Sequence, residues 1–308
     1  MKTLKEKIEL VYKELSEVIK VSCIKKNEKM SAHTTLAVGG EATLFIEPET
    51  ESEIIKAVKI IKSNDVPLYI VGRGSNLLVS DNGLNGAVLK LGDKFSSVLI
   101  CNDSMIARAG TPIATLSKLA MKNSLSGLEF ASGIPGTVGG AIAMNAGAYG
   151  GEMKDIVEWV KVIKEDGSVE VIENKDMNFS YRKSILSFNP SWVVLSIKVN
   201  LKKGKQTEIL KEMQERNEKR VISQPLSQHN CGSTFKRPDG HFAGKLIEDC
   251  GLKGYKYNDV EISSKHAGFI VNNGKSTAED MLHVINIAKK AVKEKFNITL
   301  EEEVKILK

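Results

Sequence analysis

The 308-residue chain contains few cysteines and no long apolar run. Four cysteines are scattered along it without a Cys-x-x-Cys pair: Cys23, Cys101, Cys231 and Cys250. This pattern argues against a zinc site, a disulfide framework and export, and it favours a reducing cytoplasm. Because no segment offers about 18 consecutive apolar residues, no membrane-spanning helix is expected.

An excess of one charge is also missing. The chain has 44 Lys and Arg against 38 Asp and Glu, a net charge of +6, and no basic patch interleaved with aromatic residues. We therefore expect no nucleic-acid partner, whereas anionic small molecules remain compatible with the mild positive charge. Five histidines show no metal-binding spacing, so no metal is expected: His33, His229, His241, His266 and His283.

The most informative segment is rich in glycine. Residues 124–151 hold 8 of the 25 glycines and a single charged residue, Glu129. Glycines at this density let the backbone approach a ligand closely and present its N–H groups. An uncharged, apolar segment of this kind suits a flat anionic ligand such as a dinucleotide. A tightly packed core loop without a ligand is the alternative interpretation.

The first third of the chain predicts a β-α-β unit. Strands over 42–48 and 66–71 flank an amphipathic helix over 52–63. The second strand ends in Gly72-Arg-Gly-Ser-Asn76, where a phosphate-binding turn belongs. A Rossmann fingerprint needs a third glycine, and position 77 is leucine. The loop is therefore either another kind of pyrophosphate loop or a plain strand exit.

The remaining periodicity predicts a mixed α+β fold. The chain opens with an amphipathic helix whose apolar face carries Leu4, Ile8, Val11, Leu15 and Ile19. Other expected elements are helices over 112–122 and 206–221, a hairpin at Asp166-Gly167, strands over 192–201 and 267–271, and a last helix opened by the capping-box spacing Ser276-x-x-Glu279. A domain boundary is expected at Lys202–Lys205, where KKGK interrupts the sheet pattern.

Two tempting motifs fail on spacing. Gly274-Lys275-Ser276 follows Gly268 by five intervening residues, where a Walker A loop has four. Ser233 follows a glycine, but the G-x-S-x-G pattern of a hydrolase nucleophile is not completed. On local evidence alone, Arg182 is either a carboxylate clamp or a surface cation, and the run Glu301–Glu303 is a solvated charge cluster.

Taken in chain order, eight motifs resemble one family, the UDP-N-acetylenolpyruvoylglucosamine reductases, flavoenzymes of peptidoglycan precursor synthesis. They are TTLAVGG (34–40), GRGSNLLVSD (72–81), GLEFASGIPGTVGGAIAMNAGAYG (127–150), FSYRKS (179–184), CGSTFKRP (231–238), AGKLIEDCGLKGY (243–255), HAGFIVNNG (266–274) and LEEEV (300–304). The compact length and the FKRP sequence resemble the shorter subclass of the family.

The resemblance implies an α+β fold with three domains. Two FAD-binding subdomains of the vanillyl-alcohol-oxidase type would span 1–85, with 299–308 packing near it, and 86–205. A smaller UDP-sugar domain would span 206–298. The implied reaction uses NADPH to reduce FAD, and FAD then reduces the enolpyruvyl ether of UDP-N-acetylglucosamine-enolpyruvate.

The resemblance also implies site residues. Ser233 would donate a proton to the substrate α-carbon, while Arg182 and Glu303 would stabilise the intermediate from its carboxylate side; Glu303 would need a raised pKa to share a proton. Residues implied to hold FAD are Gly72, Arg73, Gly74, Ser75, Asn76, Ser132, Gly133, Pro135, Gly136, Gly139, Gly140 and Ala143. Residues implied to contact the substrate are Asn145, Tyr149, Tyr181, Arg220 and Arg237.

Two positions depart from the family pattern. Ser223 replaces the usual basic residue in Arg220-Val-Ile-Ser-Gln-Pro225, so a phosphate contact would be weakened or moved to Lys219 or Arg220. His229 stands where a proline is common. The chain is expected to be a monomer. Two other functions stay open: a flavin dehydrogenase acting on another hydroxy acid or sugar, and a nucleotide-binding regulatory module without turnover.

Overall fold

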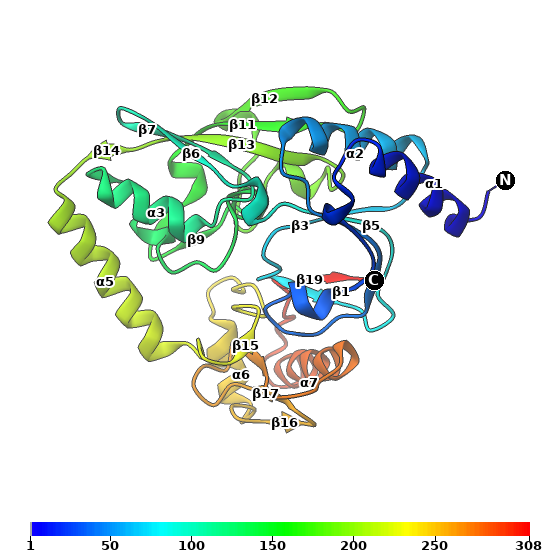
Figure 1. Ribbon diagram of the computed structural model, residues 1–308. Coiled ribbons are helices and arrows are strands. Elements are labelled where there is room, and N and C mark those ends of the chain that lie inside the picture. Colours follow the sequence, from blue (N-terminus) through cyan, green and yellow to red (C-terminus); the bar gives the residue numbers. More distant parts are fainter. Residues whose placement is uncertain (1) are drawn as a thin grey trace. The chain divides into compact units, whose positions relative to one another are not determined.

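The computed structural model describes residues 2–308 (Figure 1), so the Met1 end of the expected first domain and first helix lies outside the described residues. The chain forms two compact units, each assembled from separate stretches. The first contains residues 2–27, Thr43–Arg73 and Asn85–Glu218, and the second contains Glu28–Ala42, Gly74–Leu84 and Lys219–Lys308. The boundaries 1–85, 86–205 and 206–298 stay a prediction.

Two amphipathic helices in the first unit confirm the expected periodicity. α1 (Leu4–Ser16) and α2 (Glu51–Ser63) each begin with a capping box, in which a threonine and a glutamate exchange hydrogen bonds with the first turn. They lie side by side (Figure 1) and bury apolar residues on one face: Ile8, Val11 and Leu15 in α1, and Ile54, Ala57, Val58 and Ile61 in α2. Leu4, expected on this face, is exposed because it lies in the first turn.

The predicted β-α-β unit is present, with a strand inserted between its two strands. The four-stranded sheet has the order β1-β2-β5-β3, and β3 is parallel to β5. Its strands are β1 (Ile24–Lys29), β2 (Glu41–Ile46), β3 (Leu68–Val71) and β5 (Leu84–Lys90). β5 is buried over most of its length, as the centre of a sheet requires.

The second sheet of this unit is antiparallel, with the order β12-β11-β13-β7-β6. Its strands are β6 (Val98–Cys101), β7 (Ser104–Arg108), β11 (Val157–Ile163), β12 (Val169–Glu173) and β13 (Val193–Asn200). The hairpin expected at Asp166-Gly167 joins β11 to β12 and is confirmed. α3 (Ile113–Lys122) and α4 (Val138–Ala143) lie between these strands in sequence, and α4 packs on β7 and β13.

Short strands complete the first unit. β9 (Gly147–Ala148) and β10 (Gly151–Glu152) form a tight hairpin, and β8 (Leu125–Ser126) pairs with β14 (Lys202–Lys203). The KKGK sequence was expected to interrupt the sheet pattern. The five-stranded sheet does end with β13 at Asn200, but Lys202–Lys203 form an unexpected strand in a separate two-stranded sheet. A strand with both side chains exposed leaves no apolar alternation for sequence analysis to detect.

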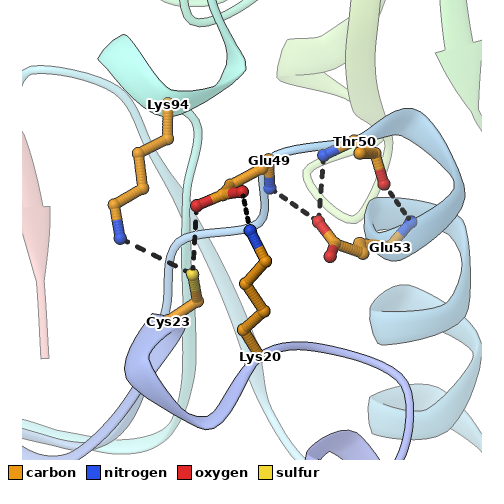
Figure 2. Close-up of polar contacts among 6 residues, drawn as sticks. All are labelled: Lys20, Cys23, Glu49, Thr50, Glu53 and Lys94. Carbon is orange, nitrogen blue, oxygen red and sulfur yellow. Dashed lines mark hydrogen bonds and ion pairs between the residues drawn. The ribbon is translucent and has the colours of Figure 1, made fainter.

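The turn before β1 is fastened to the start of α2 by a polar cluster (Figure 2). The thiol of Cys23 donates to Glu49 Oε1 at 3.6 Å and accepts from Lys94 Nζ at 3.6 Å. Lys20 Nζ lies 2.7 Å from the other oxygen of Glu49. In residues 2–308 the four cysteines form no disulfide. Cys23 therefore acts as a buried hydrogen-bonding group.

The second unit packs helices on a small antiparallel sheet of order β15-β18-β17-β16. The strands are β15 (His229–Asn230), β16 (Lys256–Tyr257), β17 (Val260–Ile262) and β18 (Ile270–Asn272), and the helices are α6 (Ala243–Asp249) and α7 (Ala278–Phe296). α7 contacts β17, β18 and α6. β4 (Leu77–Val79) pairs in parallel with β19 (Lys305–Leu307).

Two expected helices are present with shifted ends. α5 (Gln206–Ser223) runs two residues further than expected and is the long yellow-green helix of Figure 1. The N-cap of α7 is Thr277, whose side chain accepts from Asp280 N, and not Ser276 as the sequence suggested. Both spacings fit a capping box, because Thr277-x-x-Asp280 repeats the pattern one residue later. Within the described residues, no helix combines the length and apolar character needed to cross a bilayer.

Candidate active site

Ser233 is an exposed serine on a firmly held segment of the second unit. It follows Gly232, whose φ of +77° favours glycine, and precedes buried Thr234. The Thr234 N–H donates to Gly268 O at 2.9 Å, and its hydroxyl accepts from Ile270 N at 3.2 Å. Neighbouring backbone therefore fixes the segment that carries the exposed Ser233.

The three consecutive glutamates have different surroundings. Glu301 pairs with Lys236 at 2.9 Å, and Glu302 pairs with Lys289 at 2.6 Å. Glu303 is held through its main chain, where its N–H donates to Thr234 O at 2.8 Å. The structure thus places Glu303 beside the segment of Ser233, and both candidate residues lie in the second unit.

The pKa of Cys231 is affected by the negative charge of Glu303. Burial raises the pKa of the Cys231 thiol to about 12, and the carboxylate of Glu303 contributes to the rise. A negative charge near a thiol disfavours a second negative charge. The Glu303 side chain is therefore close enough to Cys231 to act on it electrostatically, and Cys231 stays neutral at physiological pH.

Arg182 lies in the first unit, in a loop that holds unusual backbone angles. Its φ is +56°, and that of Asn145 is +40°, in the left-handed region that non-glycine residues rarely adopt. The Arg182 Nη2 donates to Gly147 O at 3.4 Å, and its guanidinium lies 5.1 Å from the ring centre of Tyr181. Left-handed backbone angles at non-glycine residues are strained, persist only where surrounding contacts impose them, and are concentrated at functional sites.

Asn145 supplies those contacts. It is completely buried, and its side-chain amide donates to Ser180 O at 3.1 Å and to Glu152 Oε2 at 2.9 Å. Its carbonyl accepts from Lys154 N at 3.0 Å. Asn145 therefore joins the end of the glycine-rich segment to the loop of Arg182. Its described partners are protein groups, so its place in a substrate site remains a proposal.

Tyr149 sits at the tip of the β9–β10 hairpin with φ +52°. Its exposed ring lies 6.0 Å from the guanidinium carbon of Arg216 on α5. The next residue of α5, Asn217, accepts a hydrogen bond from Ser132 Oγ at 3.3 Å. α5 thus borders the glycine-rich segment at Arg216 and Asn217, within the first unit.

The glycine-rich segment does not leave all its N–H groups free. The N–H groups of Val138 and Gly139 donate to Thr111 O and Ala109 O, each at 2.8 Å, and that of Gly140 donates to Thr137 Oγ1 at 3.3 Å. These hydrogen bonds hold α4 in place, and the assignment of Gly139 and Gly140 to an FAD site stays a prediction.

Two glycines of this segment differ in the space around them. A Cβ at Gly139 would lie 3.1 Å from Ala109 Cβ, so a side chain there would disturb packing. A Cβ at Gly140 would meet only Thr137 Oγ1, at 3.6 Å, and Gly140 is exposed. A Cβ at Gly72 would lie 2.4 Å from the same Thr137 oxygen. Two stretches implied to hold FAD, 72–73 and 132–143, therefore meet around Thr137.

The rest of the 72–76 loop belongs to the second unit. Gly74 has φ +65°, and a Cβ there would lie 2.0 Å from His33 O. Asn76 donates through its side chain to Glu303 O at 3.0 Å, and its carbonyl accepts from Lys305 N at 2.9 Å. The loop and the C-terminal segment are consequently fixed to each other.

The remaining candidate residues give fewer contacts. Arg73 pairs with Asp93 at 3.4 Å, and Arg237 lies 4.3 Å from the ring centre of Phe242. Ser75, Gly133, Pro135, Gly136 and Tyr181 lie in loops, and Arg220 lies in the expected helix α5. Ala143 ends α4, a short helix that was not expected within the glycine-rich segment. Sequence analysis did not single out Asn217, which accepts a hydrogen bond from Ser132, or Cys231, whose pKa is raised in part by Glu303. Neither contact has a local signal, because the partners are distant in sequence.

The chain matches two family models. One, described as UDP-N-acetylenolpyruvoylglucosamine reductase, C-terminal domain, matches residues 224–307, and one described as FAD binding domain matches residues 42–173. The expected α+β class with an FAD-binding domain is thereby confirmed.

Relatives match over almost the whole chain. The UDP-N-acetylenolpyruvoylglucosamine reductase of Caldanaerobacter subterraneus subsp. tengcongensis is 44% identical over 97% of this chain and 98% of its own length. That of Clostridioides difficile is 45% identical over 96% and 97%. The crystal structure of the Thermus caldophilus UDP-N-acetylenolpyruvylglucosamine reductase (MurB) superposes with a TM-score of 0.80 at 36% identity, covering 91% of this chain and 98% of the other. The chain therefore belongs to the UDP-N-acetylenolpyruvoylglucosamine reductase family.

Proposed function

We propose that this protein reduces the enolpyruvyl ether of UDP-N-acetylglucosamine-enolpyruvate to UDP-N-acetylmuramate in peptidoglycan precursor synthesis, with NADPH as the reductant. Full-length similarity to reductases of that name supports the activity. The observation that carries the proposal is the hydrogen bond from Glu303 N to Thr234 O, because it ties an acidic residue to the segment that presents Ser233.

The residues around Thr137 fit an FAD molecule. Gly140 and Pro135 are exposed and carry no charge, and Gly72 lies against the same threonine. A surface without protruding side chains accommodates a flat ring system and a pyrophosphate. When bound, FAD would accept hydride from NADPH and pass it to the β-carbon of the enolpyruvyl group.

The protein's own groups would handle charge and the proton. Hydride addition leaves negative charge that spreads into the substrate carboxylate, and Arg182 and Glu303 would stabilise it from that side. The Ser233 hydroxyl would then protonate the α-carbon. Cys231, kept neutral by burial, would add no competing negative charge near Ser233.

The finer assignments belong to the same proposal. Gly72–Asn76 and Gly133–Gly140 would hold FAD, while Asn145, Tyr149, Tyr181, Arg220 and Arg237 would contact the UDP-sugar. We further propose a cytoplasmic monomer that acts on a small molecule, and the four scattered cysteines fit a reducing compartment.

The test separates the two half-reactions by stopped flow. Ser233→Ala should leave flavin reduction by NADPH close to wild type and slow reoxidation by UDP-N-acetylglucosamine-enolpyruvate by at least about 100-fold, the scale for losing one positioned proton donor. Ser227→Ala, another exposed serine of the second unit, is the matched control and should change neither step. A Ser233→Ala enzyme that is slow in flavin reduction but normal in reoxidation would overturn the assignment.

A further inference from the structure

His266 takes part in a hydrogen bond that requires a neutral ring. The N–H of Gly268, a buried glycine, donates to His266 Nδ1 at 3.0 Å. A ring nitrogen that accepts a hydrogen bond carries no proton, so the ring proton lies on Nε2. A protonated ring has a proton on both nitrogens and would turn an N–H group toward the N–H of Gly268. The hydrogen bond therefore exists only while His266 is neutral.

Packing holds the half-buried ring in this position. The ring of Phe269 lies edge-on to it, with the ring centres 5.0 Å apart. A Cβ at Gly244, on α6, would lie 3.1 Å from His266 Cε1, and a Cβ at Gly268 would lie 2.9 Å from the same atom. The ring thus fills the space that two glycines leave open, and it has little freedom to turn away from Gly268.

The surroundings of the ring favour its neutral form. Burial lowers the pKa of His266 below its ordinary value of 6.5, and this effect exceeds the opposite effect of its own main chain. Lys253 also lowers the pKa and Glu248, on α6, raises it, but the two side chains pair at 3.0 Å and their charges largely cancel at the ring. The neighbouring Lys265 directs its ammonium to Val221 O. His266 is therefore neutral at physiological pH.

The residue that His266 holds is also the one that holds the segment of Ser233. Gly268 O accepts the N–H of Thr234 at 2.9 Å, and Thr234 directly follows Ser233. The carbonyl of Thr234 in turn accepts the N–H of Glu303 at 2.8 Å. Without the ring nitrogen, the buried N–H of Gly268 loses this acceptor, a state that main chain relieves by moving. Such a movement would pass to Thr234 and to the serine before it.

We propose that neutral His266 is a positioning residue for the reduction of the substrate: through Gly268 and Thr234 it keeps the Ser233 hydroxyl in place to protonate the α-carbon. The inference rests on the proposed function, because that function makes Ser233 the proton donor. In this role His266 contacts none of the reacting atoms and acts through two main-chain hydrogen bonds.

Stopped-flow measurement of both half-reactions tests the assignment. His266→Leu should slow reoxidation of the flavin by substrate about 10- to 100-fold, the scale for misplacing a catalytic group by about 1 Å, and should leave flavin reduction by NADPH close to wild type. His266→Asn should restore most of the rate, because an asparagine oxygen accepts from the N–H two residues on, as Asn272 does from Gly274 N at 3.0 Å. His283→Asn, an exposed histidine of α7 stacked on Tyr257, is the matched control and should change neither step.

Two further measurements distinguish this role from a merely structural one. In wild type the reoxidation rate should fall as pH decreases through the pKa of His266, below 6.5, because protonation removes the acceptor. His266→Asn should lack this fall, since its side chain does not titrate between about pH 5 and 8. Hydrogen exchange at the amides of Gly268 and Thr234 should be faster in His266→Leu than in wild type, and this is measured without substrate.

A double variant completes the test. In Ser233→Ala, adding His266→Leu should slow reoxidation no further, because the group that His266 positions is already gone. Additive losses would overturn the assignment, as would a wild-type rate in His266→Leu or an unchanged acid limb in His266→Asn. In each of these cases a slow Ser233→Ala enzyme would leave the proposed function standing. A wild-type flavin that the substrate does not reoxidise would overturn the proposed function together with the role of His266.

Discussion

Cys231 should remain a neutral thiol at pH values where an ordinary cysteine ionises. Burial, aided by the carboxylate of Glu303, raises its pKa from 9.0 to about 12. At pH 9 the thiolate fraction is then about one in a thousand, against about one half for a cysteine with the ordinary pKa. Because only the thiolate attacks iodoacetamide, native Cys231 should react about 500-fold more slowly than the same residue in the urea-unfolded chain.

Peptide mass spectrometry after timed alkylation measures this reactivity at each pH. The rate at native Cys231 should rise about tenfold per pH unit from 8 to 11, because the thiolate fraction does. Steric blocking alone would give a low rate that levels off above pH 9. Glu303→Gln should shift the profile to lower pH, whereas Glu302→Gln should not. A profile that levels off near pH 9, or that moves equally in both variants, would refute the reasoning.

The same shift has a consequence for stability. The folded pKa of Cys231 lies above the unfolded value of 9.0, so its contribution is fully present below pH 9 and is lost as pH rises toward 12. The loss is about 1.4 kcal/mol per pH unit, or about 2.7 kcal/mol at pH 11. Urea unfolding followed by circular dichroism at pH 8 and pH 11 should show this extra loss in wild type relative to Cys231→Ala. Equal losses in the two proteins would contradict it.

Two further predictions concern the cofactor loop and the glutamate run. Gly140→Ala adds a Cβ that meets only Thr137 Oγ1, at 3.6 Å, so the melting temperature should stay unchanged while the protein loses flavin on gel filtration. A flavin absorbance equal to wild type would show that the loop serves packing and does not bind FAD. Glu303→Gln should slow substrate-driven flavin reoxidation at least about 100-fold. Glu302→Gln breaks a half-exposed ion pair with Lys289, so it should lower the free energy of unfolding by about 1 kcal/mol or less and leave the activity unchanged. Equal reoxidation rates in the two glutamine variants would show that Glu301–Glu303 are only a solvated charge cluster.

Local features of the fold could be predicted from the sequence, because their signals are local. The hairpin at Asp166-Gly167 depends on its turn residues, and α2 depends on apolar spacing and a capping box. The N-cap of α7 was placed one residue early, at Ser276, because two overlapping capping-box patterns occur there and only the fold selects Thr277. Likewise, β14 escaped prediction because neither of its exposed lysines carries an apolar signal.

The candidate site was reachable from the sequence only through motifs whose contacts are non-local. Nothing in the spacing of Glu301–Glu303 distinguishes its members, and the distinction comes from Lys236, Lys289 and Thr234, which lie elsewhere in the chain. Similarly, the glycine-rich segment predicted exposed amides, yet the amide of Gly139 turned inward to Ala109 O. Such partners are set by tertiary packing and leave no trace in a local pattern.

The parallel pairing of β19 with β4 has a consequence for the order in which the protein is made. The second unit takes Glu28–Ala42 and Gly74–Leu84 from early in the chain and Lys219–Lys308 from its end. Residues 77–79 leave the ribosome long before their partners at 305–307 are synthesised. The second unit therefore cannot close during translation, and its early strands must wait unpaired, exposed to chaperones and to aggregation, until the last residues emerge. A chain cut before residue 305 would leave β4 without its parallel partner.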